Sequence, residues 1–145
     1  MKQIKYSLDN IDAVAQQLLA DIDDAQVVTF TGSLGAGKTT FVRSLARAMG
    51  VTEPVTSPTF TYFNVYRVPE ESLSSIKLIY HFDLYRLRNL QDFESAGFFE
   101  YLYQPDSIAF IEWPDILDVV LTHDVCHVGL RVTAPDERLL MYECK

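Results

Sequence analysis

Eight consecutive residues, from Gly32 to Thr39, have the types and the spacing of a phosphate-binding loop. They read G-S-L-G-A-G-K-T and match the pattern G-x-x-x-x-G-K-[ST] in full. Glycines in this pattern let successive backbone N–H groups turn into a nest for anions, and the N-terminus of a following helix attracts the same anions. The Lys38 ammonium would reach the β- and γ-phosphates of a nucleotide, and the Thr39 hydroxyl would bind Mg²⁺.

The sequence therefore predicts a nucleotide site with Lys38 in the catalytic group. The expected contacts with the nucleotide come from the loop and from the residue after it. These residues are Gly32, Ser33, Leu34, Gly35, Ala36, Gly37, Lys38, Thr39 and Thr40.

Two acidic residues, each at the end of an apolar run, are candidates for holding the magnesium ion. Glu112 follows the apolar residues 108–111, and Asp83 follows the less apolar run 79–82. An enzyme with a phosphate-binding loop needs a carboxylate at the end of a neighbouring strand to hold the metal or its waters. An acid can also simply end a strand, so both interpretations stay open. We place Glu112 at the metal and both carboxylates in the catalytic group.

Two features beside these residues have two interpretations each. Residues 57–61 read S-P-T-F-T and form either a switch segment that closes on the γ-phosphate or an ordinary loop before a strand. Trp113 follows Glu112 directly, and it either stacks on a nucleotide base or fills a half-buried packing position.

The elements that must position these residues follow from hydrophobic periodicity. Helices are expected over 9–22, 38–49 and 90–103, the last one weakened by Gly97. Strands are expected over 27–31, 59–66, 76–82, 107–112, 125–132 and 139–144. Strands and helices interleave at the start and strands cluster at the end. This order predicts an α/β fold whose mixed sheet is parallel at its centre, antiparallel at its edges and flanked by helices.

Composition limits the classes of protein. The chain has 145 residues, of which 48% are hydrophobic, and its formal net charge is −8. We expect one domain over 1–145, because about 100–200 residues make a typical domain. A net acidic chain is a poor candidate for binding to the phosphate backbone of a nucleic acid. No stretch approaches the ~18 apolar residues of a membrane span, and no signal peptide is visible, so we expect a cytoplasmic protein without membrane contact.

The cysteines and histidines predict no metal centre. With only Cys126 and Cys144 in the chain, we expect neither a disulfide framework nor a structural zinc site. His123, Cys126 and His127 lie close together in the sequence, but strand alternation places Cys126 and His127 on opposite faces.

Four blocks together resemble a known family. They are G-S-L-G-A-G-K-T-T (32–40), S-P-T-F-T (57–61), H-F-D-L-Y-R (81–86) and I-E-W-P-D (111–115). In this order they resemble TsaE, also called YjeE, the small ATPase of bacterial tRNA threonylcarbamoyladenosine synthesis. The resemblance implies a P-loop NTPase fold, binding of ATP or ADP with Mg²⁺, and work with TsaD and TsaB. It also implies modification of adenosine 37 in tRNAs that read ANN codons, with tRNA met only through the complex.

The resemblance also implies roles for individual residues. Lys38 would hold phosphates, Thr39 and Glu112 would serve Mg²⁺, and Asp83 would support the site. Further nucleotide contacts would come from Thr59 and Thr61 in the switch segment and from Trp113 and Asp115. Two departures stand out: Ser33 replaces the usual Asp of the family, and residues 63–80 are a few residues longer than usual.

Two other functions stay open. A small-molecule kinase would use the same loop, but it usually carries a lid with phosphate-clamping arginines, and the middle third offers only Arg67, Arg86 and Arg88. A nucleotide-sensing adaptor would bind nucleotide without turnover, and Ser33 in place of an Asp fits that function. Arg138 lies near where a nucleotide base could reach.

Overall fold

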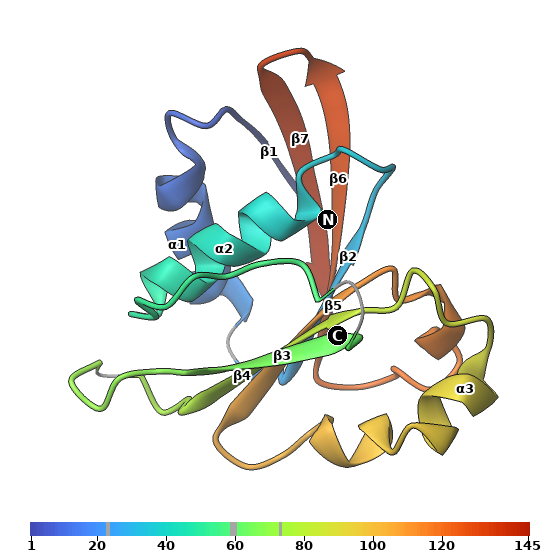
Figure 1. Cartoon of the computed structure of the whole chain (residues 1–145). Helices are drawn as coiled ribbons and strands as arrows, with labels where there is room; N and C mark the ends of the chain where they lie inside the picture. The colour runs from blue at the N-terminus through green and yellow to red at the C-terminus, as the bar shows by residue number, and fades with distance from the viewer. Residues whose placement is uncertain (23, 59–60, 73) are drawn as a thin grey trace.

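The computed structural model describes residues 1–22, 24–58, 61–72 and 74–145, and the described part forms one mixed sheet with helices on both faces (Figure 1). The strands are β1 (Lys2–Tyr6), β2 (Val27–Thr31), β3 (Phe63–Arg67), β4 (Leu78–Asp83), β5 (Ser107–Glu112), β6 (Val125–Ala134) and β7 (Glu137–Cys144). The helices are α1 (Ile11–Ile22), α2 (Lys38–Ala48) and α3 (Leu90–Ser95), with short 3₁₀ helices η1 (Phe98–Tyr101) and η2 (Asp115–Leu117).

The sheet confirms the predicted arrangement of strands. Its order is β1-β7-β6-β2-β5-β4-β3. Strand β2 pairs in parallel with β5 and β6, and β4 pairs in parallel with β5. The edge pairs β1–β7, β6–β7 and β3–β4 are antiparallel. Parallel central strands end at the same edge of the sheet, so the residues that follow β2, β4 and β5 meet there.

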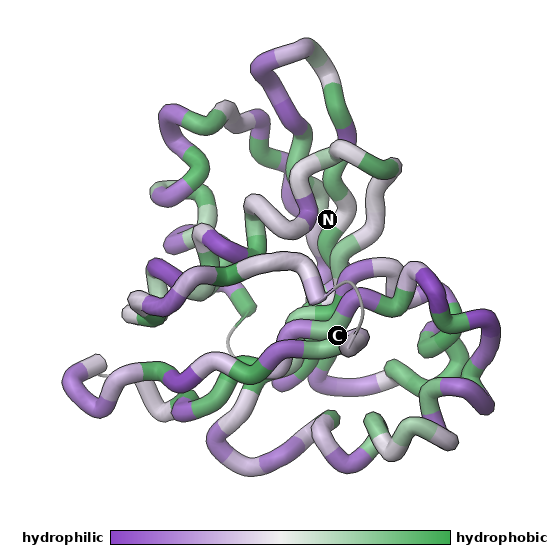
Figure 2. The backbone as a smooth tube through the Cα atoms, viewed as in Figure 1, coloured by the Kyte–Doolittle hydropathy of each residue, from purple (hydrophilic) through white to green (hydrophobic). Residues whose placement is uncertain are grey.

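Alternation along the strands divides the core between the two faces of the sheet. In β2, Val28 and Phe30 belong to the cluster that packs under α1 and α2, whereas Val27 belongs to the cluster that packs against α3 and η1. Figure 2 shows hydrophobic residues gathered along the central strands and hydrophilic ones in the outer connections. In β5, Glu112 lies two residues beyond Phe110 and therefore shares the face covered by α2.

Two predicted elements differ from the structure. The helix expected over 90–103 is wrong as a single helix: α3 ends at Ser95, Gly97 adopts φ +79°, and a 3₁₀ turn follows. Strand β1 was not predicted, because its polar, mostly exposed residues Lys2–Tyr6 carry little apolar alternation and pair only at the edge of the sheet. Strand β3 begins at Phe63 rather than at 59, and residues 59 and 60 lie outside the described part.

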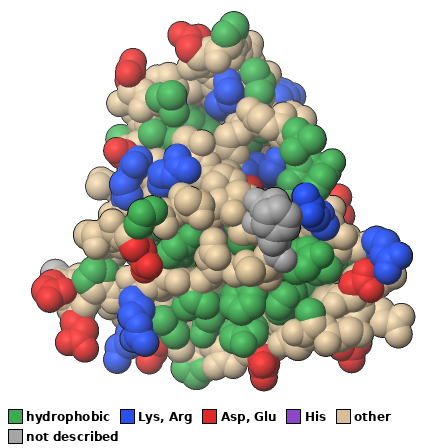
Figure 3. All heavy atoms as spheres, in the orientation of Figure 1, with side chains coloured by type: hydrophobic (Ala, Val, Ile, Leu, Met, Phe, Trp, Pro, Cys, Tyr) green, Lys and Arg blue, Asp and Glu red, His purple; other side chains and the backbone are tan. Residues whose placement is uncertain are grey.

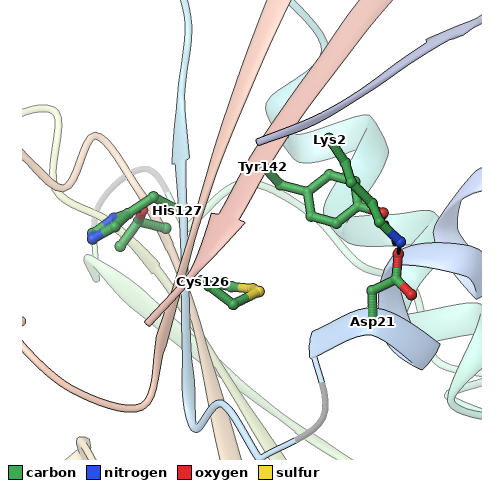
Figure 4. The surroundings of a disulfide bond; sticks show 7 residues. Lys2, Asp21, Cys126, His127 and Tyr142 are labelled. Carbon is green, nitrogen blue, oxygen red and sulfur yellow. Dashed lines mark hydrogen bonds and ion pairs between the residues drawn. A yellow bond between two sulfur atoms is a disulfide. The ribbon is translucent and has the colours of Figure 1, made fainter.

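The two cysteines are joined by a disulfide, although the sequence analysis expected no disulfide framework from only two cysteines. Cys126 and Cys144 are direct partners in the β6–β7 register, although 18 residues separate them in the sequence. Figure 4 shows Cys126 on the same side of the sheet as Tyr142 and Asp21, with His127 on the other side. The opposite faces predicted for Cys126 and His127 are thus confirmed.

The surface carries charges of both signs. Figure 3 shows Lys, Arg, Asp and Glu side chains scattered over one face, with apolar side chains gathered on its lower part. In the described part of the chain, every helix is too short or too polar to cross a bilayer.

Candidate nucleotide-binding site

The glycine-rich loop connects the end of β2 at Thr31 to the start of α2 at Lys38, as predicted. Two of its glycines are required by the backbone. Gly37 caps α2 with φ +96°, a left-handed backbone conformation that residues other than glycine rarely adopt. Gly32 has φ +154°, and a Cβ there would lie 2.6 Å from the carbonyl oxygen of Leu130. The loop therefore packs directly against β6, and its path requires glycine at both of these positions.

The Lys38 side chain turns back over the loop. Its Nζ donates hydrogen bonds to the carbonyl oxygens of Gly32 at 2.6 Å and Ser33 at 2.9 Å. The same ammonium lies 4.1 Å from the ring centroid of Trp113, a cation–π contact. Burial lowers the pKa of Lys38, and the nearby carboxylates of Glu112 and Asp83 partly counteract that effect. The Lys38 ammonium is thus held against the start of the loop, at Gly32 and Ser33.

Thr39 and Glu112 face each other across the loop and the end of β5. The Thr39 hydroxyl lies 2.9 Å from both carboxylate oxygens of Glu112. The residue Glu112 is 2% exposed, and its Oε2 also lies 2.5 Å from Nε2 of His81 on β4. The structure therefore brings together the two residues predicted to serve a metal. It adds a histidine to which the sequence analysis assigned no role.

Asp83 ends the neighbouring strand and lies beside the same edge. It pairs with Glu112 in the parallel β4–β5 register. Its Oδ2 accepts a hydrogen bond from the Ser57 hydroxyl at 3.0 Å, and its Oδ1 accepts one from the backbone N–H of Tyr85 at 3.1 Å. The start of the S-P-T-F-T segment is therefore tied to Asp83. Thr59 lies outside the described residues.

The remaining predicted contacts lie around this edge. Thr61 donates from its hydroxyl to the carbonyl of Phe63 at 3.1 Å. Trp113 adopts φ +56° directly after β5, and its ring lies 4.8 Å from that of Tyr85. Together with its contact to Lys38, this places Trp113 beside the Lys38 end of the loop. Asp115 is exposed at the start of η2.

A cavity of about 440 Å³ opens on another side of the loop. Its lining comes from three segments that are far apart in the sequence: the β1–α1 connection, the loop with the start of α2, and the β6–β7 hairpin. The lining residues are Tyr6, Ser7, Leu8, Asp9, Ile11, Gly35, Ala36, Gly37, Thr40, Pro135, Asp136 and Arg138. Sequence patterns pointed only to Arg138 and the loop, because no motif marks residues 6–9 or the hairpin.

Arg138 fixes the hairpin to the loop. Its Nε donates to the carbonyl oxygen of Ala36 at 3.1 Å, and its Nη1 donates to the carbonyl oxygens of Ala134 at 3.2 Å and Glu137 at 3.1 Å. Burial raises the pKa of Tyr6, beside Arg138 in the cavity wall, to about 12, and the Arg138 charge partly offsets the rise. One guanidinium thus couples the wall of the cavity to the backbone of the glycine-rich loop.

The fold and the site together define the class of protein. A strand, a glycine-rich loop and a helix lie on a mixed sheet, with an acid at the end of the adjacent parallel strand. This is the arrangement of α/β proteins of the P-loop type.

Comparisons with known proteins give the family. The family model described as "Threonylcarbamoyl adenosine biosynthesis protein TsaE" matches residues 6–140. The chain belongs to the TsaE family, which the resemblance of its four motif blocks predicted. It is 30% identical to the tRNA threonylcarbamoyladenosine biosynthesis protein TsaE of Bacillus subtilis, over 98% of this chain and 86% of the relative.

Other relatives agree with this family. The tRNA threonylcarbamoyladenosine biosynthesis protein TsaE of Treponema pallidum is 37% identical over 117 residues, which cover 81% of each chain. The crystal structure of Bacillus subtilis YdiB superimposes with a TM-score of 0.70 and 26% identity, over 97% of this chain and 84% of that one.

Proposed function

We propose that the chain binds ATP with Mg²⁺ at residues 32–39 and hydrolyses it, weakly when alone, within the machinery that installs threonylcarbamoyl groups on tRNA. The modified position would be adenosine 37 of tRNAs that read ANN codons. TsaD and TsaB homologues would be its partners, and the chain would contact tRNA only through their complex. Membership of the TsaE family supports the pathway.

One observation carries the nucleotide part of this proposal: Lys38, Thr39 and Glu112 converge at one end of the loop. The hydroxyl oxygen of Thr39 lies 2.9 Å from the carboxylate oxygens of Glu112. The ammonium of Lys38 is close enough to Glu112 for the carboxylate to affect its pKa. A triphosphate needs this combination of a cation, a hydroxyl and a carboxylate. The three side chains come from a helix start and a strand end that the sheet brings together.

The donor set suits Mg²⁺. This ion prefers oxygen ligands and is usually held by one or two carboxylates together with phosphate oxygens and waters. The described residues contain no group of three or more His, Cys, Asp or Glu side chains that could hold a metal. Thr39 and Glu112 would therefore hold Mg²⁺ only together with the nucleotide. Bound Mg²⁺ would neutralise charge on the phosphates.

A nucleotide-sensing adaptor is a second candidate function, and Ser33 favours it. Ser33 is exposed in the loop, and its hydrogen bond with Lys38 in the described part of the chain goes through its backbone carbonyl. Where the family usually has a carboxylate, this chain offers a neutral hydroxyl. Such a loop would still bind phosphates, because the nest is built from backbone N–H groups. The adaptor would bind ATP without turnover.

Steady-state hydrolysis of Mg-ATP separates the two functions. The purified chain is measured alone and with its TsaD and TsaB counterparts, with the Lys38→Ala variant as the blank. Slow turnover that rises clearly with the partners supports the ATPase. ATP binding without turnover in every mixture contradicts the ATPase, and Ser33→Asp is then the first variant to test for recovered hydrolysis.

A further inference from the structure

The side chain of His81 has no role in the site as described so far, yet it is fully buried beside the candidate metal ligand. The imidazole is 0% exposed, and its Nε2 lies 2.5 Å from Oε2 of Glu112. Its Nδ1 has no hydrogen-bond partner among the described residues. A carboxylate without a proton can only accept, so a hydrogen bond to such a carboxylate requires the proton on Nε2. In the described part of the chain, Glu112 is the one polar side chain that this imidazole contacts through a hydrogen bond.

The surroundings of His81 do not otherwise call for a polar residue. Its register partner on β5 is Phe110, and Ile79 precedes it on the same face in the core under α1 and α2. The ring of Tyr66 lies 6.4 Å away. An apolar side chain would fill this position without the cost of burying a polar group. The hydrogen bond to Glu112 is therefore the feature that distinguishes histidine here.

The two partners of Glu112 differ in what they do when a metal binds. Thr39 belongs to the phosphate loop, and under the proposed function its hydroxyl turns to Mg²⁺. His81 belongs to a central strand and has no such second task. We propose that His81 is a positioning residue: it holds Oε2 of Glu112 in place, so that the carboxylate keeps its orientation and presents Oε1 to the metal or its waters after Thr39 has turned away. This inference rests on the proposed function.

Hydrogen-bond partners behind a metal ligand have measurable effects. Their removal typically weakens metal affinity about 10–100-fold. Loss of the His81 hydrogen bond should accordingly weaken the binding of Mg²⁺ and leave the binding of phosphates unchanged. In the described part of the chain, His81 bonds to Glu112 and to neither the loop nor Lys38. A purely structural role would instead weaken metal-free and metal-dependent binding together.

The first test compares two substitutions. His81→Leu removes the donor and keeps an apolar filling, whereas His81→Gln keeps an N–H donor at the end of a side chain of similar length. His127 supplies the matched control: it lies on β6, contacts Thr29 on the opposite face of the sheet, and is replaced by Leu. Fluorescence of Trp113, the only tryptophan in the chain, reports nucleotide binding, because Lys38 lies over its ring. The fluorescence response to ADP is titrated with Mg²⁺ for each variant.

We expect His81→Leu to raise the Mg²⁺ concentration at half-response about tenfold, with ADP affinity in EDTA changed less than about twofold. His81→Gln should recover most of the response, and His127→Leu should match wild type. Equal Mg²⁺ midpoints for His81→Leu and wild type overturn the inference, as do equal losses for Leu and Gln. If wild type gives no response to Mg-ADP and calorimetry detects no binding, the proposed function itself fails and the inference falls with it.

A second measurement needs no variant and decides the matter if His81→Leu does not fold. Long-range ¹H–¹⁵N NMR spectra identify which ring nitrogen of His81 carries the proton, before and after addition of Mg-ADP. We expect the Nε2-protonated tautomer in both states. A proton on Nδ1 alone in the free protein, or loss of the Nε2 proton when Mg-ADP binds, overturns the inference.

Discussion

The Thr39 hydroxyl lies 2.9 Å from each of the two carboxylate oxygens of Glu112. The single hydroxyl proton is shared between two acceptors, and under the proposed function a cation would replace this contact. Thr39 opens α2 and Glu112 ends β5, and their meeting depends on the parallel pairing of β2 with β5. The proposed nucleotide chemistry therefore depends on the sheet as much as on the loop.

Replacing Glu112 by Gln tests the metal assignment. Glutamine keeps the shape and still accepts a hydrogen bond from His81, but it removes the negative charge. We expect the Mg²⁺ concentration for half-maximal ADP binding to rise about 10–100-fold, because a neutral amide is a poor magnesium ligand. Binding of metal-free ADP should change little. Isothermal titration with and without EDTA measures both quantities, and equal Mg²⁺ dependence in the two proteins would remove Glu112 from the metal site.

Replacing Lys38 by Ala tests the phosphate assignment. The ammonium bonds to carbonyl oxygens of the loop and not to the core, so the variant should keep its fold as judged by circular dichroism. ATP affinity should fall about 10–100-fold, since one hydrogen bond to a charged group contributes about 1.5–3 kcal/mol. The exposed residue Lys5, changed to Ala, is the control. Unchanged ATP affinity in a folded Lys38→Ala protein would contradict the assignment.

Local patterns predicted most of the fold, because the central elements carry strong periodicity. Residues 107–112 are buried throughout and 27–31 nearly so, and both appeared as short apolar runs. The edge strand β1 escaped prediction because pairing with β7, and not its own composition, makes it a strand. In the sequence, Gly97 only weakened the prediction of a helix over 90–103 and did not predict that α3 ends at Ser95.

The site, too, has a part that the sequence predicted and a part that it did not. The phosphate loop and Glu112 follow from motif spacing, since both are local features of the chain. The cavity wall and His81 do not, because each depends on which distant segments the sheet places side by side. Residues 6–9 reach the loop through the β1–β7 and β6–β7 pairings. His81 was an unexplained polar residue in an apolar strand, and its partner lies 31 residues away.

The stability of the fold should fall at alkaline pH in part through Tyr6. Burial raises the pKa of Tyr6 from 10.0 to about 12. Between these values the unfolded chain loses the phenol proton while the folded protein keeps it. The stabilisation is therefore complete below pH 10 and is lost as the pH rises through 12. Tyr142 adds to the same loss, because its burial and its hydrogen bond to Asp21 raise its pKa to about 12 as well.

Tyr6→Phe should reduce this alkaline loss by about 2–3 kcal/mol at most, since one pKa unit corresponds to about 1.4 kcal/mol. Urea unfolding at several pH values between 9 and 12 measures the slope. Tyr85→Phe, at a residue that is 56% exposed, is the control. A Tyr6→Phe protein that loses stability as steeply as wild type over this range would show that Tyr6 ionises equally in the folded and unfolded states.

Replacing Arg138 by Ala separates the contribution of the base and ribose to ATP binding from the contribution of the phosphates. Its guanidinium ties the β6–β7 hairpin to Ala36 of the loop, so Arg138→Ala should loosen one wall of the cavity. If the base and ribose of ATP occupy that cavity, ATP affinity should fall about tenfold, as expected for losing one or two hydrogen bonds of about 0.5–1.5 kcal/mol each. Inorganic tripolyphosphate, which has neither base nor ribose, should lose less than about twofold.

Competition against a fluorescent ADP analogue measures both ligands in one format. Arg131→Ala, at an exposed position on the same strand pair, is the matched control and should leave both affinities unchanged. Equal losses for ATP and tripolyphosphate would mean that Arg138 supports the phosphate loop alone. The base would then have to be sought elsewhere, beginning with Trp113, whose ring already lies against Lys38.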